Sequence, residues 1–435
     1  MSNTWFRLRR GFFLSFFPSD TPHYENVPFE LPNSWVWCRL EDIAYVASGS
    51  TPDKTCFVEN GVPYIKMYNL RNQKIDFAYH PQYITEEVHN GKLQRSRAEV
   101  GDLIMNIVGP PLGKLAIIPT TLPQANFNQA AVLIRPYKFK EVLVSYLKIY
   151  LEEMSEINSI ATRGSAGQVN ISLTQSQNMR IPIPPLNEVR RIIEEVSKYD
   201  ILIDSLKQNI TDIQNLIAYT KSKILDLAIH GKLVPQDPND EPAIELLKRI
   251  NPDFTPCDNG HYPVGWIETI LGELFSHNTG KALNSSNKEG IFKDYLTTSN
   301  VYWNKFDFTA IKQMPFKESE LNKCTVTKGD LLVCEGGDIG RSAIWNYDYD
   351  ICIQNHIHRL RPKIDLCVPF YYYTFAYLKE NNLIGGKGIG LLGLSSNALH
   401  KIEMPLPPLA EQQRIVQKIE ELFSVLDNIQ NALEV

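Results

Sequence analysis

The sequence predicts an α+β protein with two mixed α/β domains in tandem repeat, separated and joined by long helices that pair as an antiparallel coiled coil. Two observations support this prediction. Apolar residues in two segments, 187–229 and 412–433, recur at alternating steps of three and four, which is the spacing of a coiled-coil seam. Short motifs also recur in the same order in both halves of the 435-residue chain, which is typical of an internal repeat.

The longest predicted element is a helix over residues 187–229. Pro184 and Pro185 precede it and Gly231 follows it, as expected at the start and end of a helix. At about 1.5 Å per residue this helix is a rod roughly 60 Å long, and its apolar seam requires a partner. The seam residues expected to pair are Val196, Tyr199, Ile203, Leu206, Ile210 and Ile213.

A second segment near the C-terminus repeats both this seam and its lead-in. The run Ile181–Leu186 corresponds to Met404–Leu409, and both runs contain the Pro-Pro-Leu sequence that opens the helix. We therefore expect the two helices to pair, and the alternative is two amphipathic helices that each cover a separate core. The seam residues expected in the distal helix are Ile415, Ile419, Leu422, Leu426 and Ile429.

The globular segments 31–186 and 261–409 are each predicted to fold as one domain. Shared anchors in both are a tryptophan (Trp35 and Trp266), a Gly-Asp-Leu turn and an Arg-Pro pair. Short β-rich runs are followed by one helix in each half. The predicted strands are 103–108, 115–118 and 130–134 in the first half, and 330–334, 343–347 and 351–360 in the second. The predicted helices are Val142–Ile157 and Pro369–Lys379.

Composition and charge narrow the possible functions. The net charge is −5, but residues 187–260 hold 9 basic against 13 acidic side chains, and residues 410–435 hold 2 against 5. The acid surplus therefore lies on the helices, which permits a basic face on each domain. Seven scattered cysteines without a C-x-x-C pair predict buried thiols in a reducing cytoplasm and not a disulfide framework. No apolar run approaches the roughly 20 residues of a membrane span.

Few residues carry recognisable catalytic chemistry. The chain has no Asn-Pro-Pro-Tyr motif for amino methylation and no phosphate-binding loop that ends in Gly-Lys-Ser/Thr. His356 and His358 would lie on one strand face, but no third ligand is nearby, so we expect no metal site. These observations predict a chain without catalytic residues.

Four features together point to a known family. They are the entry run Val27–Trp35, the twin Gly-Asp-Leu turns, the two Pro-Pro-Leu helix starts and, most specific, the run Leu225–Ala243 (LDLAIHGKLVPQDPNDEPA). In these features the chain resembles the specificity subunit of Type I restriction–modification systems, from about residue 27 to the end.

The resemblance implies a function for each segment. Residues 31–186 and 261–409 would be target-recognition domains, each reading one half of a bipartite DNA site. Residues 187–260 would be the central conserved helical spacer and linker, and residues 410–435 the distal conserved helix. Residues 1–30 remain an unassigned leader. The bare pattern also fits a two-headed coiled-coil scaffold or adaptor that binds proteins only.

The same resemblance implies the partners and cofactors. The chain would bind double-stranded DNA and two methyltransferase subunits, with restriction subunits in the full complex and no membrane. It would be non-catalytic and bind no cofactor, and S-adenosylmethionine would bind to the methyltransferase partners.

Candidate DNA contacts are polar and basic residues in turns, because Arg and Lys reach guanine edges or phosphates and Asn and Gln pair with adenine. The candidates in the first domain are Ser50, Thr51, Lys66, Tyr68, Asn69, Arg71, Lys114, Gln129 and Gln168. Those in the second are Lys281, Thr298, Asn300, Arg341, Asn355, His356 and Lys387. Lys114 with Arg341, and Gln129 with Asn355, occupy repeated positions and are the better candidates.

Overall fold

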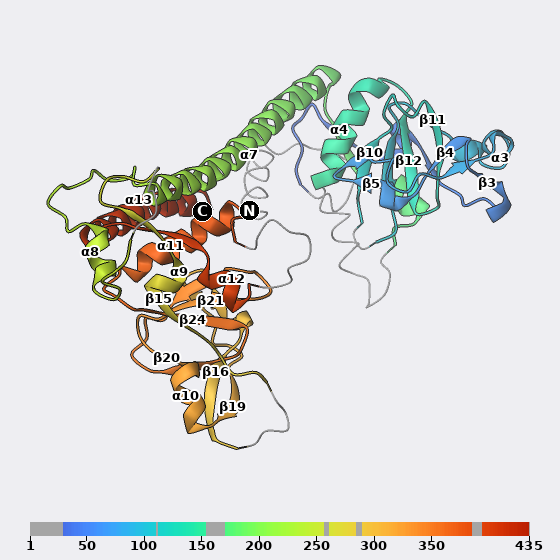
Figure 1. Cartoon of the computed structure of the whole chain (residues 1–435). Helices are drawn as coiled ribbons and strands as arrows, with labels where there is room; N and C mark the ends of the chain where they lie inside the picture. The colour runs from blue at the N-terminus through green and yellow to red at the C-terminus, as the bar shows by residue number, and fades with distance from the viewer. Residues whose placement is uncertain are drawn as a thin grey trace. The chain divides into compact units, whose positions relative to one another are not determined.

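The computed structural model describes residues 29–109, 112–153, 170–255, 261–283, 289–384 and 394–434. The chain divides into two compact units, Met1–Ser205 and Leu206–Val435 (Figure 1). Over the described ranges, none of the helices is long and apolar enough to span a membrane.

The first unit is built on two small sheets. One has the order β10 (Leu115–Ile117), β9 (Leu103–Asn106), β12 (Ala131–Pro136) and β2 (Ala44–Ser48). The other has the order β3 (Phe57–Val58), β7 (Tyr83–Ile84), β4 (Val62–Ile65), β11 (Gln124–Phe127) and β8 (Ala98–Glu99). Two strand pairs complete the unit: β1 (Val36–Arg39) with β13 (Arg180–Ile183), and β5 (Leu70–Arg71) with β6 (Lys74–Ile75).

Four helices of the first unit are short or cover the sheets. They are α2 (Leu40–Ile43), α3 (Glu86–Asn90), α4 (Lys140–Glu153) and α6 (Leu173–Gln177). The helix predicted at 142–157 corresponds to α4, and its positions 154–157 lie outside the described residues. The buried face of α4 packs beside the β9–β12 sheet. Val189, at the start of the long helix α7 (Leu186–Ile229), is fully buried in the same core, so α7 begins as part of this unit.

The second unit repeats this plan. One sheet has the order β15 (Phe275–Thr279), β24 (Ile357–Pro362), β21 (Leu331–Cys334) and β22 (Ser342–Ile344). The other has the order β19 (Lys312–Phe316), β16 (Ile291–Leu296), β23 (Ile351–Ile353) and β20 (Thr325–Val326). Its strand pairs are β14 (Ile267–Ile270) with β25 (Glu403–Leu406), and β17 (Val301–Tyr302) with β18 (Lys305–Phe306). Its helices are α8 (Ala243–Lys248), α9 (Leu271–Leu274), α10 (Glu318–Cys324), α11 (Val368–Glu380), α12 (Ser396–His400) and α13 (Leu409–Leu433).

The predicted tandem repeat and its α+β class are confirmed by this shared topology. One predicted strand is wrong: residues 351–360 form two strands, β23 and β24, in different sheets. A tight turn separates them, in which the amide of Ile357 donates to the carbonyl of Gln354. The turn is formed by Gln354, Asn355 and His356, and no glycine or proline marks it in the sequence.

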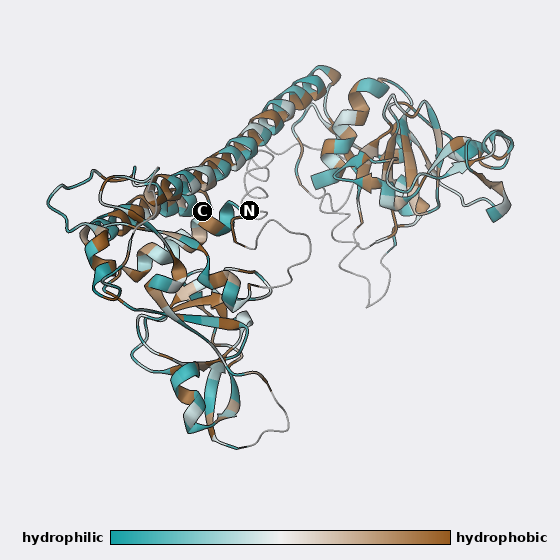
Figure 2. Cartoon of the chain, viewed as in Figure 1, coloured by the Kyte–Doolittle hydropathy of each residue, from teal (hydrophilic) through white to brown (hydrophobic). Residues whose placement is uncertain are grey.

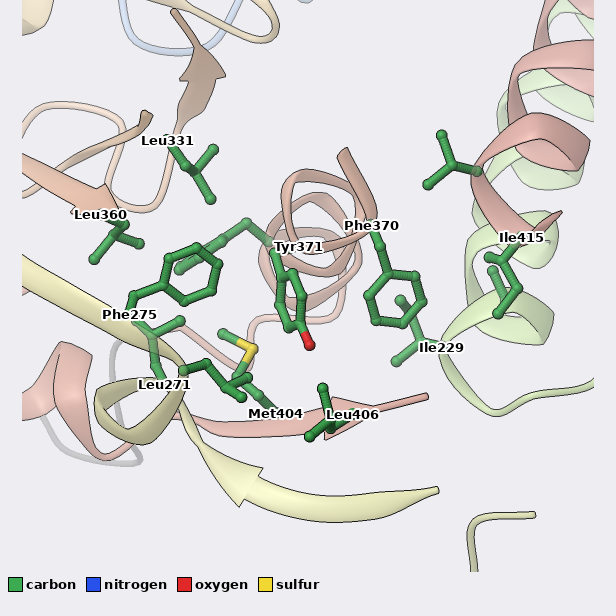
Figure 3. Packing of buried hydrophobic residues seen from close by; sticks show 14 of the residues in the cluster. Ile229, Leu271, Phe275, Leu331, Leu360, Phe370, Tyr371, Met404, Leu406 and Ile415 are labelled. Atoms are coloured by element: carbon green, nitrogen blue, oxygen red, sulfur yellow. The ribbon is translucent and has the colours of Figure 1, made fainter. Parts of the chain in front are cut away.

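The largest core lies in the second unit and includes the end of α7. Ile229 from α7, Ile415 from α13 and Phe370 from α11 belong to one buried cluster, which also holds Phe275 and Tyr371 (Figure 3). The segment after α7 joins this cluster through the buried face of α8. The run 225–243 is therefore a structural element that fastens the second domain to the helices.

The C-terminal part of α7 pairs with α13 in antiparallel fashion. Ile224 and Ile229 of α7 share the buried cluster with Ile415 and Ile419 of α13, and Leu422 and Leu426 pack against it. Lys221 of α7 pairs with Asp427 near the end of α13 at 2.5 Å, whereas Gln236, which follows α7, donates to Glu411 near the start of α13 at 2.7 Å, so the two helices run in opposite directions. The coiled-coil prediction is confirmed for this stretch.

Several seam residues predicted to pair are uncovered. Figure 2 shows hydrophobic residues along much of α7, yet Tyr199, Leu206 and Ile213 are 46%, 60% and 39% exposed. Val196, Ile203 and Ile210 are only partly buried, and Ile429 in α13 is 44% exposed. The register of the two helices explains the uncovered part of α7. Gln236 and Asp240, which follow α7, contact Glu411 and Arg414 in the first two turns of α13, so only the C-terminal part of α13 runs beside α7.

Candidate nucleic-acid interface

An ion pair with a buried aspartate anchors the strands that carry the candidate loops in each domain. Asp102, of the first Gly-Asp-Leu turn, is fully buried and accepts hydrogen bonds from the guanidinium of Arg135 at 2.9 and 2.5 Å. Asp330 accepts equivalent bonds from Arg361, both at 2.7 Å. These hydrogen bonds raise the pKa of Arg135 and of Arg361. The repeated Gly-Asp-Leu and Arg-Pro motifs are therefore two halves of one structural contact.

A glycine turn in the first domain brings three predicted residues together. A Cβ on Gly49 would collide with the backbone carbonyl of Asn128, so only glycine permits this approach of two backbone segments. The hydroxyl of Thr51 donates to the side chain of Gln129 across this contact. Ser50 lies in the same turn and accepts a hydrogen bond of 3.1 Å from Arg95. The hydrogen bond between Thr51 and Gln129 is exposed, so their polar groups face solvent.

A hairpin made by β5 and β6 carries the next group of candidates. Its two-residue tip, Asn72 and Gln73, has positive φ at both positions, which is the geometry of a tight type I′ turn. The amide of Leu115, next to Lys114, donates to the Gln73 side chain at 2.7 Å. Lys114 is therefore held beside the hairpin that bears Arg71.

Asn69 and Asn300 are placed differently from the expectation that they contact DNA. Asn69 is fully buried, accepts from the amide of Lys66 at 2.9 Å and donates to the carbonyls of Asp76 and Tyr79. Asn300 is 2% exposed, accepts from the amide of Thr297 at 2.8 Å and donates to the carbonyl of Asp307 at 2.9 Å. Each asparagine links the chain segments before and after its hairpin, and in this structure neither side-chain amide is accessible to a base.

Lys281 is also committed within the protein. Its side chain is 10% exposed, and its amine lies 2.6 Å from Glu320 and 2.7 Å from the carbonyl of Pro315. The hydrogen bond from Lys281 is the main cause that lowers the pKa of Glu320. The amine of Lys281 is thus largely buried and bonded within the protein, so in this structure it supports the fold and is not available to DNA.

The remaining candidates of the second domain lie around two turns. Asn355 is partly buried, and its backbone N–H donates to the carbonyl of Lys281 at 3.0 Å. His356 is exposed and lies 3.4 Å from a carboxylate oxygen of Glu335. Arg341 donates to the carbonyl of Thr298 at 2.5 Å, which places both residues at the β17–β18 hairpin. Arg341 and Lys114 thus occupy matching positions beside matching hairpins.

Two of the candidate residues, and the residues considered as metal ligands, remain to be placed. Gln168 and Lys387 lie outside the described residues. The parts of the chain that the structure describes contain no group of three or more His, Cys, Asp or Glu side chains placed to hold a metal ion. His358 is instead buried and hydrogen-bonded to His277 and to the carbonyl of Leu394, both at 2.7 Å.

Residues that the sequence did not single out join these clusters. Arg95 contacts Ser50, and Tyr79 lies under the guanidinium of Arg71 with 4.2 Å to the ring centroid. His80 stacks edge-on to Tyr79 at 4.5 Å. Arg95 lies in a short 3-10 helix, and Tyr79 and His80 lie in the segment after β6. The sequence gives no sign that these residues lie close to the candidates, because the fold brings them together.

Comparison with known proteins identifies the family of this chain. The model of the Type I restriction modification DNA specificity domain matches residues 32–215 and again residues 263–435, one match for each repeat. The chain belongs to this family.

Relatives and solved structures agree with this membership. The EcoEI specificity subunit of Escherichia coli is 24% identical, over 94% of this chain and 80% of the relative. A putative MjaX specificity subunit of Methanocaldococcus jannaschii is 23% identical, over 92% of this chain and 89% of the relative. The fold is similar to that of the HsdS subunit from Thermoanaerobacter tengcongensis, with a TM-score of 0.55, 19% identity and 93% of each chain covered. A chain from a structural study of type I R-M complex assembly gives a TM-score of 0.58 at 20% identity, with 94% of each chain covered.

Proposed function

We propose that this protein is the DNA-specificity subunit of a Type I restriction–modification complex, in which each domain reads one half of a bipartite site. The observation that carries the proposal is the repeated family match, one match for each of two domains of the same topology. The matching glycine turns and hairpins give each domain polar loops on a fixed frame. The adaptor alternative lacks support of this kind, because it predicts no likeness to DNA-specificity domains.

Salt-dependent DNA binding tests this proposal. The chain, in complex with its methyltransferase partners, should bind duplexes containing its site with an affinity that falls linearly in log–log plots against salt, because phosphate contacts release counterions. Exchange of residues 31–186 for the same segment of a relative should change one half-site and leave the other. A complex with no salt slope, or a chimera in which both half-sites change, would contradict the proposal.

The helices are proposed to set the distance between half-sites. Insertion of two heptads after Ile210, with a matching pair after Leu433 in α13, preserves the seam and lengthens α7 by about 21 Å. The spacer should then grow, by up to about six base pairs if α7 lay along the DNA axis, because B-DNA rises about 3.4 Å per base pair. Methylome sequencing of a strain that carries the variant measures the spacer. An active variant with the original spacer would show that another element sets the gap.

The acidic helices are proposed to contact two methyltransferase subunits. Residues 187–260 carry 13 acidic against 9 basic side chains, which disfavours contact with DNA phosphates. Reversal of Glu194 and Glu195, at the exposed N-terminal part of α7, should weaken methyltransferase binding in pull-down titrations. The methylated sequence should stay the same, and an altered motif would contradict this assignment.

The chain itself is proposed to be non-catalytic, to bind no cofactor and to act in the cytoplasm, where the DNA is. S-adenosylmethionine would bind to the methyltransferase subunits, since this sequence lacks nucleotide-binding and amino-methylation motifs. Calorimetry of the isolated chain with S-adenosylmethionine should show no heat of binding. Micromolar affinity would refute this part of the proposal.

A further inference from the structure

The β5–β6 hairpin of the first domain is a rigid mount for an exposed arginine. Buried Asn69 closes the chain segments on either side of it, through bonds to Lys66, Asp76 and Tyr79. The Gln73 side chain ties the tip to β10. A side chain on this hairpin is therefore presented from a fixed backbone, which base recognition requires.

The guanidinium of Arg71 lies over the ring of Tyr79 and keeps N–H donors that are not hydrogen-bonded within the described residues. Its central carbon lies 4.2 Å from the centroid of the Tyr79 ring. Its closest acidic group, Asp76, is 3.9 Å away, beyond hydrogen-bond distance. Among the described residues the Arg71 guanidinium makes no hydrogen bond, and its side chain is 47% exposed. The contact with the Tyr79 ring thus restrains the group while its N–H donors remain available to a ligand.

The platform under Arg71 is aromatic and itself ordered. Tyr79 is 42% exposed and contacts Tyr68 and His80 at centroid distances of 6.2 and 4.5 Å. The Tyr68 hydroxyl donates to the carbonyl of His80 at 3.2 Å. Tyr79 is therefore held by its neighbours while its ring stays partly exposed beside the guanidinium.

The second domain contains the same arrangement built from different positions. Tyr302 takes the place of Arg71, 231 residues later, just as Asn300 takes the place of Asn69. Tyr302 is 44% exposed, and the guanidinium of Arg341 lies 5.0 Å from its ring centroid. Each hairpin therefore supplies one partner of an arginine–tyrosine contact: the cation Arg71 in the first domain and the ring of Tyr302 in the second.

We infer that Arg71, held by Tyr79, reads a guanine in the major groove of the first half-site, an assignment that rests on the proposed function. A stacked, planar guanidinium with free N–H groups matches the O6 and N7 acceptors of guanine in a bidentate contact. A phosphate contact needs only positive charge, which a lysine supplies equally well. The arginine-specific features on this hairpin are the planar set of N–H donors and its contact with the Tyr79 ring.

The test uses the chain in complex with its methyltransferase subunits and a duplex panel. Methylome sequencing first defines the wild-type site, and the panel then varies each base pair of both half-sites. Arg71→Lys should lose about 10- to 100-fold of the discrimination at one G·C pair of the first half-site. Tyr79→Phe, which keeps the ring, should retain it, and Tyr79→Leu should lose part of it.

The internal controls separate this assignment from its alternatives. Lys74→Ala removes an exposed positive charge from the same hairpin and should leave discrimination intact. The second half-site should be read as before in every variant, which reports on folding and assembly. A uniform loss over all duplexes in Arg71→Lys, or an unchanged motif, would overturn the guanine assignment alone. A wild-type complex without salt-dependent, sequence-specific binding would overturn the proposed function as well.

Discussion

Replacement of Tyr371 by phenylalanine is expected to stabilise the second unit. Tyr371 is fully buried in α11, and its ring contacts Phe275 at 5.2 Å and Phe370 at 5.3 Å between centroids (Figure 3). Its hydroxyl is buried and has no hydrogen-bond partner within the described part of the chain. Burial raises the pKa of this phenol well above its usual value, so the group stays neutral.

The size of the effect follows from the hydroxyl. A hydroxyl buried without a partner costs about 1–3 kcal/mol relative to water. Removal of the hydroxyl avoids this cost but leaves a small cavity where the oxygen was. That cavity reduces the gain by only a few tenths of a kcal/mol, at about 24 cal/mol per Å³. The net gain is about 1–2 kcal/mol, which in a unit of this size raises Tm by about 2–8 °C.

A second tyrosine supplies the matched control with the opposite sign. Tyr146 in α4 of the first unit is 2% exposed, but its hydroxyl donates to the carbonyl of Pro182. Tyr146→Phe should therefore cost about 1 kcal/mol. Differential scanning calorimetry of both variants of the full chain measures the two shifts. If Tyr371→Phe lowers Tm as Tyr146→Phe does, the Tyr371 hydroxyl has a partner and the reasoning fails.

Three further outcomes are expected from the same structure. Asp330→Asn should cost about 2–3 kcal/mol by leaving Arg361 without its buried carboxylate, whereas Asp348→Asn, in an exposed pair with Lys328, should cost under about 0.5 kcal/mol in urea titrations. Ile419→Ala should cost about 2–4 kcal/mol through loss of helix packing, while Leu206→Ala on the uncovered seam should change unfolding of the isolated chain by less than about 0.5 kcal/mol. Burial and the neighbouring His358 lower the pKa of His277 from 6.5 to about 4. Folding therefore favours the neutral form of His277. The stability that this residue contributes is present above the ordinary histidine pKa of the unfolded chain and is lost as the pH falls toward the folded-state value. His277→Asn should flatten the fall of Tm over that pH range, and an unchanged slope would contradict the assignment.

The long helices could be predicted closely because their signals are local. The seam, the prolines and Gly231 placed the central helix at 187–229, and it spans Leu186–Ile229. The extent of pairing could not be predicted, since it depends on how far α13 reaches along α7. The seam pattern is the same in paired Ile224 and in exposed Leu206, and sequence periodicity does not distinguish them.

The candidate contacts were harder to predict because accessibility is a tertiary property. Asn69 and Asn300 stand in polar turns like many surface residues, and only the fold shows that their amides bond to the loop backbone. Lys281 follows a glycine, as Ser50 does, and the local sequence therefore treats the two alike. In the fold, however, Lys281 is paired with Glu320, which is 39 residues away in the sequence. Conversely, the Arg71–Tyr79 pair had no signal, because a hairpin turn brings the two residues together.

Comparison of the two repeats distinguishes the residues that support the fold from the exposed residues that can contact DNA bases. Positions that carry the same residue in both, such as Trp35 with Trp266 and Asp102 with Asp330, are buried. Positions at which the repeats differ include exposed sites on the hairpins, where Arg71 matches Tyr302. Substitution at an exposed loop position usually changes stability by less than about 0.5 kcal/mol, whereas the buried pairs tolerate little change. One fold can therefore present different side chains to each half of a DNA site, and the two halves of that site need not share a sequence.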